Sequence, residues 1–283
     1  MSRVYRALEK AEEEKKQKGK EDRPLKSFEE KAVLKKEVAT LKFPEEKIQR
    51  LEELGLPPKE ETAVLIVPPH SFAGEEFRKL KAQIFQRLPS PPHSILVTSA
   101  APQEGKTMVA VNLAVSVSQE IHRKAILVDA DLRKPSIHLE RNQNSKGLSN
   151  YLSDGTPLSE ILINSEMQNL QIIMAGASTS KSSELIGSKR MQDLLKSLRE
   201  SGDHTYVIFD SPPIISTTEP TLLSKMVDGI ILVVMADRAP KETISRAIKS
   251  LDRQKIIGVV FNQIDLNPSS YYSKYYYRYY RKY

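Results

Sequence analysis

The sequence predicts an α/β protein built on a mostly parallel sheet, with helices on both faces of that sheet. From about residue 71 onward, short and continuously apolar segments alternate with longer amphipathic segments. Strands that are apolar on both faces are typical of a parallel sheet buried between two layers of helices. The segments do not repeat at a fixed period, so a solenoid is not expected.

Each expected element has the hydrophobic pattern and the length of its class. The segments expected to be strands are 94–98, 125–128, 170–174, 206–209, 229–235 and 256–261. The segments expected to be helices are 73–88, 107–119, 188–200 and 241–253. Residues 63–67, between two proline pairs, form a candidate further strand.

The two ends of the chain differ from this central region. Half of the first 60 residues are charged, with 16 Lys/Arg and 14 Asp/Glu, and their sparse apolar residues are spaced as in helices. The last 13 residues hold eight of the 11 tyrosines and no aliphatic side chain, as in a disordered low-complexity tail. We therefore expect a charged helical and linker extension at 1–62, a folded domain at 63–268 and a disordered, Tyr-rich tail at 269–283.

Composition excludes several classes of protein. The sequence has no cysteine, so it holds neither a disulfide nor a cysteine nucleophile, and a reducing cytoplasm is the expected location. The longest apolar run, 230–236, is far shorter than the ~20 residues of a membrane-spanning helix, and the first residues lack the apolar core of a secretion signal. Of the net charge of +7, +4 lies in the last 13 residues, so the body lacks the broad basic face of a nucleic-acid-binding protein.

A phosphate-binding loop is predicted between the expected strand 94–98 and the expected helix 107–119. Residues 100–107 read AAPQEGKT and match the P-loop pattern G-x-x-x-x-G-K-[ST], except that Ala100 replaces the first glycine. Backbone N–H groups of such a loop surround the phosphates, Lys106 would reach the β- and γ-phosphates, and the Thr107 hydroxyl would bind Mg²⁺. The expected nucleotide-binding residues here are Pro102, Gln103, Glu104, Gly105, Lys106, Thr107 and Met108.

Carboxylates follow two other expected strands. Asp129 and Asp131 come directly after one strand, and Asp210 follows another. Ligands of an open parallel sheet bind beyond the carboxyl ends of its strands, so these acids are expected to face the phosphate loop. Asp129 or Asp131 alone could equally be a helix cap or a solvated loop residue. Together with the loop they favour a Mg·ATP site in which Asp210 holds the metal.

The three motifs together resemble those of the bacterial tyrosine autokinases that govern capsule and exopolysaccharide export. The resemblance covers about residues 68–283. It includes Asp129-x-Asp131-x-Arg133, the strand end 210–213, the connecting segments 147–152 and 175–186, and the terminal tyrosine cluster. The H-R-D and D-F-G landmarks of eukaryotic protein kinases are absent.

The resemblance implies an ATP-dependent protein-tyrosine kinase that phosphorylates its own tail and regulates polysaccharide synthesis and export. The implied catalytic residues are Lys106, Asp129, Asp131, Arg133 and Asp210. Among these, Asp129 would act near the attacking phenol, as a base or through the metal, and Arg133 would support the site or a neighbouring subunit. The implied autophosphorylation sites are Tyr271, Tyr272, Tyr275, Tyr276, Tyr277, Tyr279, Tyr280 and Tyr283.

The cofactors implied are ATP and Mg²⁺. The metal would be held by Thr107, Asp129 and Asp210, with Asp131 completing the site. Asn262, which follows the last expected strand, has the position that the family uses to contact adenine. Glu219 departs from the family pattern, because an Asp often stands there.

A second resemblance concerns assembly. Glu75, Arg78 and Lys81 resemble the E-x-x-R-x-x-R stretch that joins subunits of the family into a ring, and on a helix they share one face. Lysine in the third position lacks the bidentate fork of arginine, and a solvated charged face is the alternative interpretation. Family members of this shorter form are activated by a separate membrane-embedded polysaccharide co-polymerase. The implied location is therefore the inner face of the membrane, reached through that partner.

Two other functions share some of these features. Positioning ATPases of the Par and Min type have the same fold, but they carry a lysine where this chain has Ala101, and they lack a tyrosine-rich tail. A non-catalytic scaffold could use its basic, aromatic tail to bind single-stranded nucleic acid or an anionic membrane surface.

Overall fold

The computed structural model describes residues 66–88, 90–137, 146–236 and 239–264. By backbone contacts the chain divides into two units, 1–58 and 59–283, and every described residue belongs to the second. The expected extension 1–62 and tail 269–283 therefore lie outside the described residues, as do residues 63–65 of the candidate strand 63–67. Ile66 and Val67, which are described, belong to no strand.

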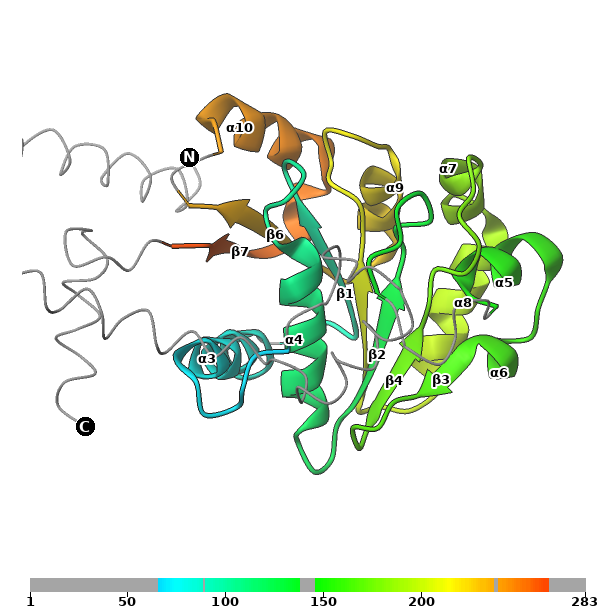
Figure 1. The fold of residues 1–283 in the computed structure, drawn as a ribbon, viewed down its shortest axis with the longest axis horizontal. Helices are drawn as coiled ribbons and strands as arrows, with labels where there is room; N and C mark the ends of the chain where they lie inside the picture. The colour runs from blue at the N-terminus through cyan, green and yellow to red at the C-terminus, as the bar shows by residue number, and fades with distance from the viewer. Residues whose placement is uncertain (1–65, 89, 138–145, 237–238, 265–283) are drawn as a thin grey trace, which may run out of the picture. The chain divides into compact units, whose positions relative to one another are not determined.

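The described residues form a seven-stranded sheet with the strand order β3-β4-β2-β5-β1-β6-β7 (Figure 1). Its strands are β1 (Ser94–Ser99), β2 (Lys124–Asp129), β3 (Leu162–Asn164), β4 (Leu170–Ile173), β5 (Thr205–Asp210), β6 (Gly229–Met235) and β7 (Ile256–Asn262). All neighbouring pairs are parallel except β3 and β4, which pair antiparallel. The predicted fold class is confirmed.

Helices cover both faces of this sheet. On one face, α3 (Phe72–Arg87) and α4 (Lys106–Ser118) pack against apolar side chains such as Ile95, Leu127 and Ile208. The opposite face, with Leu96, Phe209 and Leu232, packs against a second set of helices. That set comprises α5 (Leu148–Asp154), α7 (Ser182–Ile186), α8 (Lys189–Glu200), α9 (Glu219–Met226) and α10 (Lys241–Ser250), with the short α6 (Leu158–Ile161) between α5 and β3.

The alternation of faces explains the continuously apolar strands. In β1, Ile95 and Val97 belong to one core cluster while Leu96 belongs to the other, because successive side chains of a strand point to opposite faces. Every residue of β1 and β5 is buried. The two strands therefore lie in the middle of the sheet, where the helices above and below them exclude water.

Helix α4 is unusually buried. Ten of its 13 residues are buried, and it packs between the sheet and α3. Six of its 13 residues are Ala or Val and Lys106 is its one charged residue, as expected for a helix that exposes almost no face to water. The phosphate loop that precedes it is therefore attached to one of the most enclosed elements of the domain.

Several segments differ from the sequence prediction. Helix α10 ends at Ser250 and not at residue 253, because Leu251 takes an extended conformation (φ −96°, ψ 161°) that buries its side chain, and residues 253–255 form a 3-10 turn. Strand β3 was not predicted, since three residues carry too little periodicity to be recognised. No helix in the described ranges combines the length and apolar character that crossing a bilayer requires.

Candidate active site

The phosphate loop and both acidic segments meet at the carboxyl edge of the sheet. Strand β5 lies between β1, which leads into the loop, and β2, which ends at Asp129. Asp129 and Asp210 are register partners on β2 and β5, so the last residues of these two strands lie side by side. Parallel strands end at the same edge, which is why three segments distant in sequence form one crevice.

Helix α4 begins directly at this crevice. Its N-cap is Gly105, whose φ of 85° lies in the left-handed region that favours glycine. A Cβ at this position would lie 2.0 Å from the Asn262 Nδ2 atom, so a side chain is also excluded by contact. The N–H groups of the first helical turn, at Lys106, Thr107 and Met108, have no carbonyl partner within the helix and are available to an anionic ligand.

The Lys106 ammonium group lies between two carboxylates. Its Nζ atom is 3.9 Å from Asp131 Oδ2 and 3.8 Å from Asp210 Oδ1, and it donates a hydrogen bond of 3.2 Å to Thr107 Oγ1. All four side chains were predicted to share a site, and the structure brings them together. The lysine is therefore held where two acids and one hydroxyl converge.

Asp210 is fully buried in this crevice. Neither of its carboxylate oxygens has a hydrogen-bond partner within the described part of the chain. Burial raises the pKa of Asp210 to about 6, although the positive charge of Lys106 opposes that rise. Buried carboxylate oxygens without partners are costly unless a cation or a water ligand of a cation satisfies them. This observation fits a divalent metal bound through Asp210.

Asp129 is also fully buried, but its oxygens are hydrogen-bonded. Oδ1 accepts from Asp131 N at 3.0 Å, and Oδ2 accepts from Ser136 N and Ile137 N, both at 3.1 Å. Burial, together with repulsion from Asp210, raises the pKa of Asp129 to about 7, against the lowering effect of these backbone donors. Asp129 thus organises the loop that follows β2 and titrates near neutral pH.

Arg133 points to another buried carboxylate, that of Glu219. Its Nε atom donates to Glu219 Oε1 at 3.0 Å and to Ser182 Oγ at 2.8 Å. Glu219 is fully buried and also accepts hydrogen bonds from the Ser182 and Ser183 hydroxyls. Although burial raises it, hydrogen bonding led by Ser182 brings the pKa of Glu219 down to about 2. Arg133, predicted as catalytic, is therefore held at the side of the crevice by the starts of α7 and α9.

Asn262 lies against the phosphate loop. Its Nδ2 atom donates to the Glu104 carbonyl at 2.9 Å, and the next residue, Gln263, reaches the Gln103 carbonyl at 3.5 Å. The end of β7 therefore contacts the loop directly. The side chain of Glu104 also forms hydrogen bonds within the protein, to backbone N–H groups, and sequence reasoning missed these contacts.

The residues expected at a subunit interface separate into two groups on α3. Arg78 forms an ion pair with Glu75 and donates to the Pro69 carbonyl at 2.6 Å, and both charged side chains are exposed. Lys81 instead turns to α4, where its Nζ atom lies 2.9 Å from Glu120 Oε1 and donates to the Ser116 carbonyl at 3.1 Å. Its side chain is only 15% exposed.

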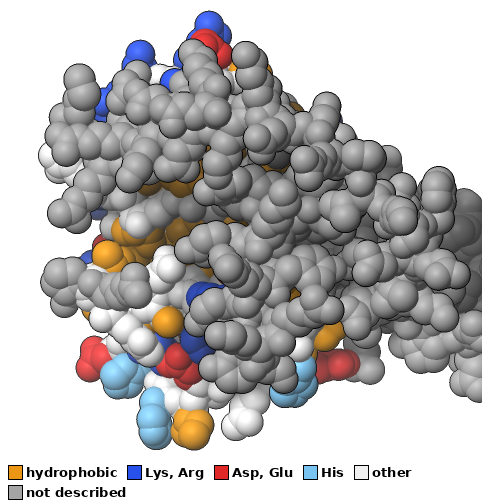
Figure 2. Space-filling model, turned by 90° about the vertical axis from the view of Figure 1, so that its left-hand side faces the viewer, with side chains coloured by type: hydrophobic (Ala, Val, Ile, Leu, Met, Phe, Trp, Pro, Cys, Tyr) orange, Lys and Arg blue, Asp and Glu red, His pale blue; other side chains and the backbone are white. Residues whose placement is uncertain are grey.

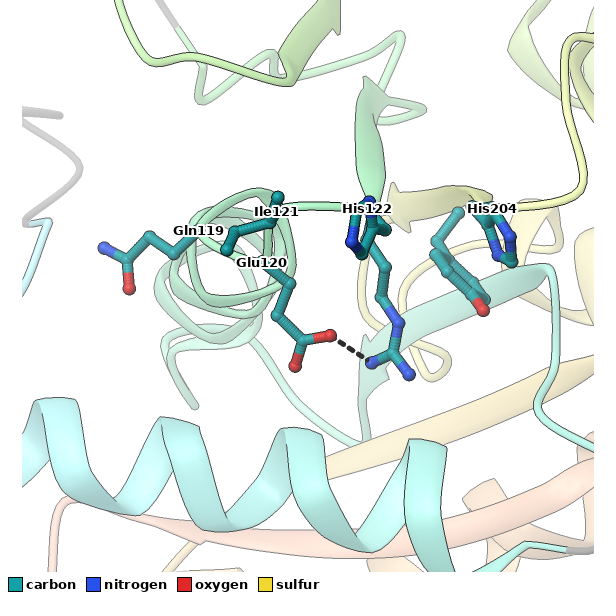
Figure 3. Close-up of a pocket in the computed structure, with 7 residues that line it drawn as sticks. Gln119, Glu120, Ile121, His122 and His204 are labelled. Atoms are coloured by element: carbon teal, nitrogen blue, oxygen red, sulfur yellow. Dashed lines mark ion pairs between the residues drawn. The ribbon is translucent and has the colours of Figure 1, made fainter.

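A separate depression lies at the opposite end of the strands, where β2 and β5 begin (Figure 3). It is lined by Gln119, Glu120, Ile121, His122, Arg123, His204 and Tyr206. These residues precede β2 and β5 or begin them, whereas the predicted site lies where the same strands end. Figure 2 shows histidine side chains at the lower edge of the described part of its face, beside acidic, basic and apolar ones.

Comparison with known proteins agrees with this geometry. Residues 99–257 match the family model of an AAA domain. The chain is 31% identical to the tyrosine-protein kinase YwqD of Bacillus subtilis over 216 residues, which span 75% of this chain and 90% of YwqD. It is also 31% identical to the tyrosine-protein kinase CpsD of Streptococcus pneumoniae over 182 residues, spanning 62% of this chain and 78% of CpsD.

Solved structures give the same result. The chimerical protein CapA2B2 superposes with a TM-score of 0.66 and 31% identity, over 78% of this chain and 99% of that one. The kinase domain of the Escherichia coli tyrosine kinase ETK superposes with a TM-score of 0.64 and 25% identity, over 78% and 90% of the two chains. The cell division ATPase MinD of Pyrococcus furiosus, at 18% identity and a TM-score of 0.52, shares the fold. With its P-loop, its two acidic strand ends and these relatives, the chain belongs to the bacterial tyrosine-protein kinase family.

Proposed function

We propose that this chain transfers the γ-phosphoryl group of ATP to tyrosines of its own tail and thereby regulates capsule or exopolysaccharide synthesis and export. One observation carries the proposal: Lys106 lies within 3.9 Å of carboxylates from two different strand ends, at the start of the P-loop helix. The acceptors proposed are the eight tyrosines between residues 271 and 283. In this division, residues 63–268 form the catalytic domain and 1–62 an extension.

The described residues can supply each part of the transfer. Free N–H groups at the start of α4 and the Lys106 ammonium would hold the phosphates and stabilise the charge on the transferring group. A phenol has a pKa of about 10 and is a poor nucleophile when neutral. As the phenol oxygen forms its bond to the γ-phosphorus and the bond to the ADP oxygen breaks, the phenol proton passes to the Asp129 carboxylate. A pKa of about 7 suits Asp129 to that role.

The side chains at the crevice also fit Mg²⁺. Both oxygens of Asp210 are buried without a hydrogen-bond partner among the described residues, although Lys106 Nζ lies 3.8 Å from Oδ1. Asp129, Asp131 and the Thr107 hydroxyl lie at the same edge. Oxygen ligands of this kind are those that Mg²⁺ prefers. When bound, the metal would neutralise part of the charge of the phosphates. Asn262, whose amide already contacts the loop, is the proposed neighbour of adenine.

Mass spectrometry of the tail after incubation with Mg·ATP tests the proposal. We expect phosphate on tail tyrosines in the unchanged protein, and its loss in Lys106→Met and Asp129→Ala. A candidate membrane activator is included in parallel, because the shorter members of the family are expected to need one. ATP turnover with unmodified tyrosines, in the presence of the activator, would show a positioning ATPase instead.

The proposal includes a partner and an assembly. A separate membrane-embedded activator would hold the chain at the inner face of the membrane, and the exposed Glu75 and Arg78 pair would contribute to a ring. Lys81 is engaged with α4, so it would contribute to a ring only by leaving Glu120. Three phosphates of about −1.5 to −2 charge each would reverse the +4 of the tail and release it from acidic surfaces. Measurement of the molecular mass of the Arg78→Ala assembly in solution tests the ring, because loss of this contact should leave smaller assemblies.

A further inference from the structure

We propose that Glu104 is a positioning residue for the nucleotide: its buried carboxylate holds the phosphate loop in the binding conformation and ties it to the ends of β6 and β7. This inference rests on the proposed nucleotide binding at the P-loop, but not on kinase activity. It assigns to the Glu104 side chain a role distinct from that of the loop backbone, which would contact the phosphates.

The contacts of the carboxylate carry the argument. Glu104 is only 3% exposed, and its Oε2 atom accepts a hydrogen bond of 2.7 Å from Ala101 N at the other end of the loop. Its Oε1 atom accepts from Met235 N, at 3.3 Å, where β6 ends. A carboxylate facing the ligand would repel phosphates. Here both oxygens accept hydrogen bonds from backbone N–H groups, so the negative charge stabilises the loop and does not face the ligand.

The loop needs such support because its backbone is strained. Gln103 adopts a φ of 65°, a left-handed conformation that costs a non-glycine residue roughly 1 kcal/mol or more, and Gly105 adopts a φ of 85°. Two left-handed residues on either side of Glu104 turn its side chain into the protein. Ala100 replaces the first glycine of the usual P-loop, and the Glu104 carboxylate accepts from the N–H of the next residue, Ala101.

The main chain of Glu104 is tied to the same strands. Its carbonyl accepts from Asn262 Nδ2, and Asn262 is the register partner of Met235 on the neighbouring strand. One residue of the loop therefore contacts both strand ends beside which the base of the nucleotide would lie. Loss of the carboxylate leaves two backbone N–H groups, at the partly buried residues Ala101 and Met235, without their acceptor, and an unsatisfied donor that is shielded from water costs free energy.

Nucleotide binding to the full chain measures the effect. Glu104→Gln keeps the size of the side chain but places an amide NH₂ against one of the two backbone donors. We expect its Kd for a fluorescent ADP analogue to rise about tenfold, and that of Glu104→Ala more, since one or both hydrogen bonds are lost. Pyrophosphate competition should weaken by a similar factor, because the phosphate loop is what changes. Glu166→Gln, at an exposed glutamate far along the chain, is the matched control and should leave both unchanged.

Two further measurements separate positioning from general stability. Each Kd is taken at a temperature where circular dichroism shows the variant to be fully folded. In the unchanged protein without nucleotide, amide hydrogen exchange should be slow at Ala101 and Met235 but fast at Lys106 and Thr107, and ADP should slow the latter two. Where phosphate transfer is measurable, the KM for ATP should rise, while kcat should change by less than about twofold because the reacting carboxylates are untouched.

An unchanged Kd in folded Glu104→Gln would overturn the proposal, as would fast exchange at Ala101 in the unchanged protein. If the unchanged chain binds ADP but phosphorylates no tyrosine, the kinase proposal fails while the binding and exchange results still decide the role of Glu104.

Discussion

Replacing Asp210 with asparagine should stabilise the protein in the absence of nucleotide and Mg²⁺, although it removes a residue proposed for the metal site. Asp210 is fully buried, and neither oxygen has a hydrogen-bond partner in the described part of the chain. Burial raises its pKa from 3.8 to about 6. At 1.36 kcal/mol per pH unit, ionised Asp210 therefore costs the folded state about 3 kcal/mol.

The sign of the pH dependence follows from the raised pKa. Below pH 3.8 the carboxyl is protonated in both the folded and the unfolded state, and it carries no penalty. As the pH rises from 3.8 to about 6, the unfolded state loses its proton first, so the folded state loses stability, and above about pH 6 the loss is complete. The difference in unfolding free energy between Asp210→Asn and the unchanged protein should therefore grow by about 2–3 kcal/mol between pH 4 and pH 8.

Urea denaturation in EDTA at several pH values measures this difference. Asp129 loses the repulsion of Asp210 in the variant, which adds to the growth with pH, whereas titrating groups remote from this site are common to both proteins and cancel. Asp203→Asn, at an exposed aspartate, is the control that should show no growth with pH. Addition of Mg·ADP should reverse the order, because only the unchanged protein gains the stabilisation of a bound ligand. A difference that stays constant from pH 4 to pH 8 would refute the reasoning.

Three more predictions concern single positions. Gly105→Ala should weaken ADP binding at least tenfold in calorimetry, because its φ is 85° and its Cβ would meet Asn262 at 2.0 Å, whereas Gly258→Ala, with open space around its Cβ, should not. Phe209→Ala should lower the unfolding free energy by about 3–5 kcal/mol in urea, since the ring is fully buried; a loss below 1 kcal/mol would contradict this packing. Glu219→Gln should cost stability above pH 4.5 and progressively less toward pH 2, because the pKa of Glu219 is lowered from 4.5 to about 2; a cost that does not shrink with acidification would exclude that ionised cluster.

Much of the fold could be predicted from the sequence because its strands are continuous apolar runs. All six predicted strands between residues 94 and 262 exist, with ends within two residues of the prediction. Helices α5, α6, α7 and α9 were not predicted, since each has eight residues or fewer and carries little periodicity of its own. The start of α5, for example, is held by hydrogen bonds from Leu148 and Ser149 to the carbonyls of Met174 and Ala175. Local periodicity carries no information about such contacts.

The candidate site was predictable to the level of its crevice and not of its hydrogen bonds. The rule that ligands bind beyond strand ends placed Lys106, Asp131 and Asp210 together, and the structure agrees. Spacing on a helix also put Lys81 on the face of Arg78, yet its flexible side chain turns to α4. The partner of Glu104 is a backbone N–H group that every residue possesses, so no residue type in the sequence marks it.

The burial of helix α4 bears on how the phosphate loop can move. Its 13 residues make a rod about 20 Å long, nearly all of it enclosed, with the phosphate loop at one end. Near the other end the carbonyl of Ser116 accepts a hydrogen bond from Lys81 of α3. Because α4 is held by the sheet and by α3 along most of its length, we expect its two ends, the phosphate loop and the last turn, to move together.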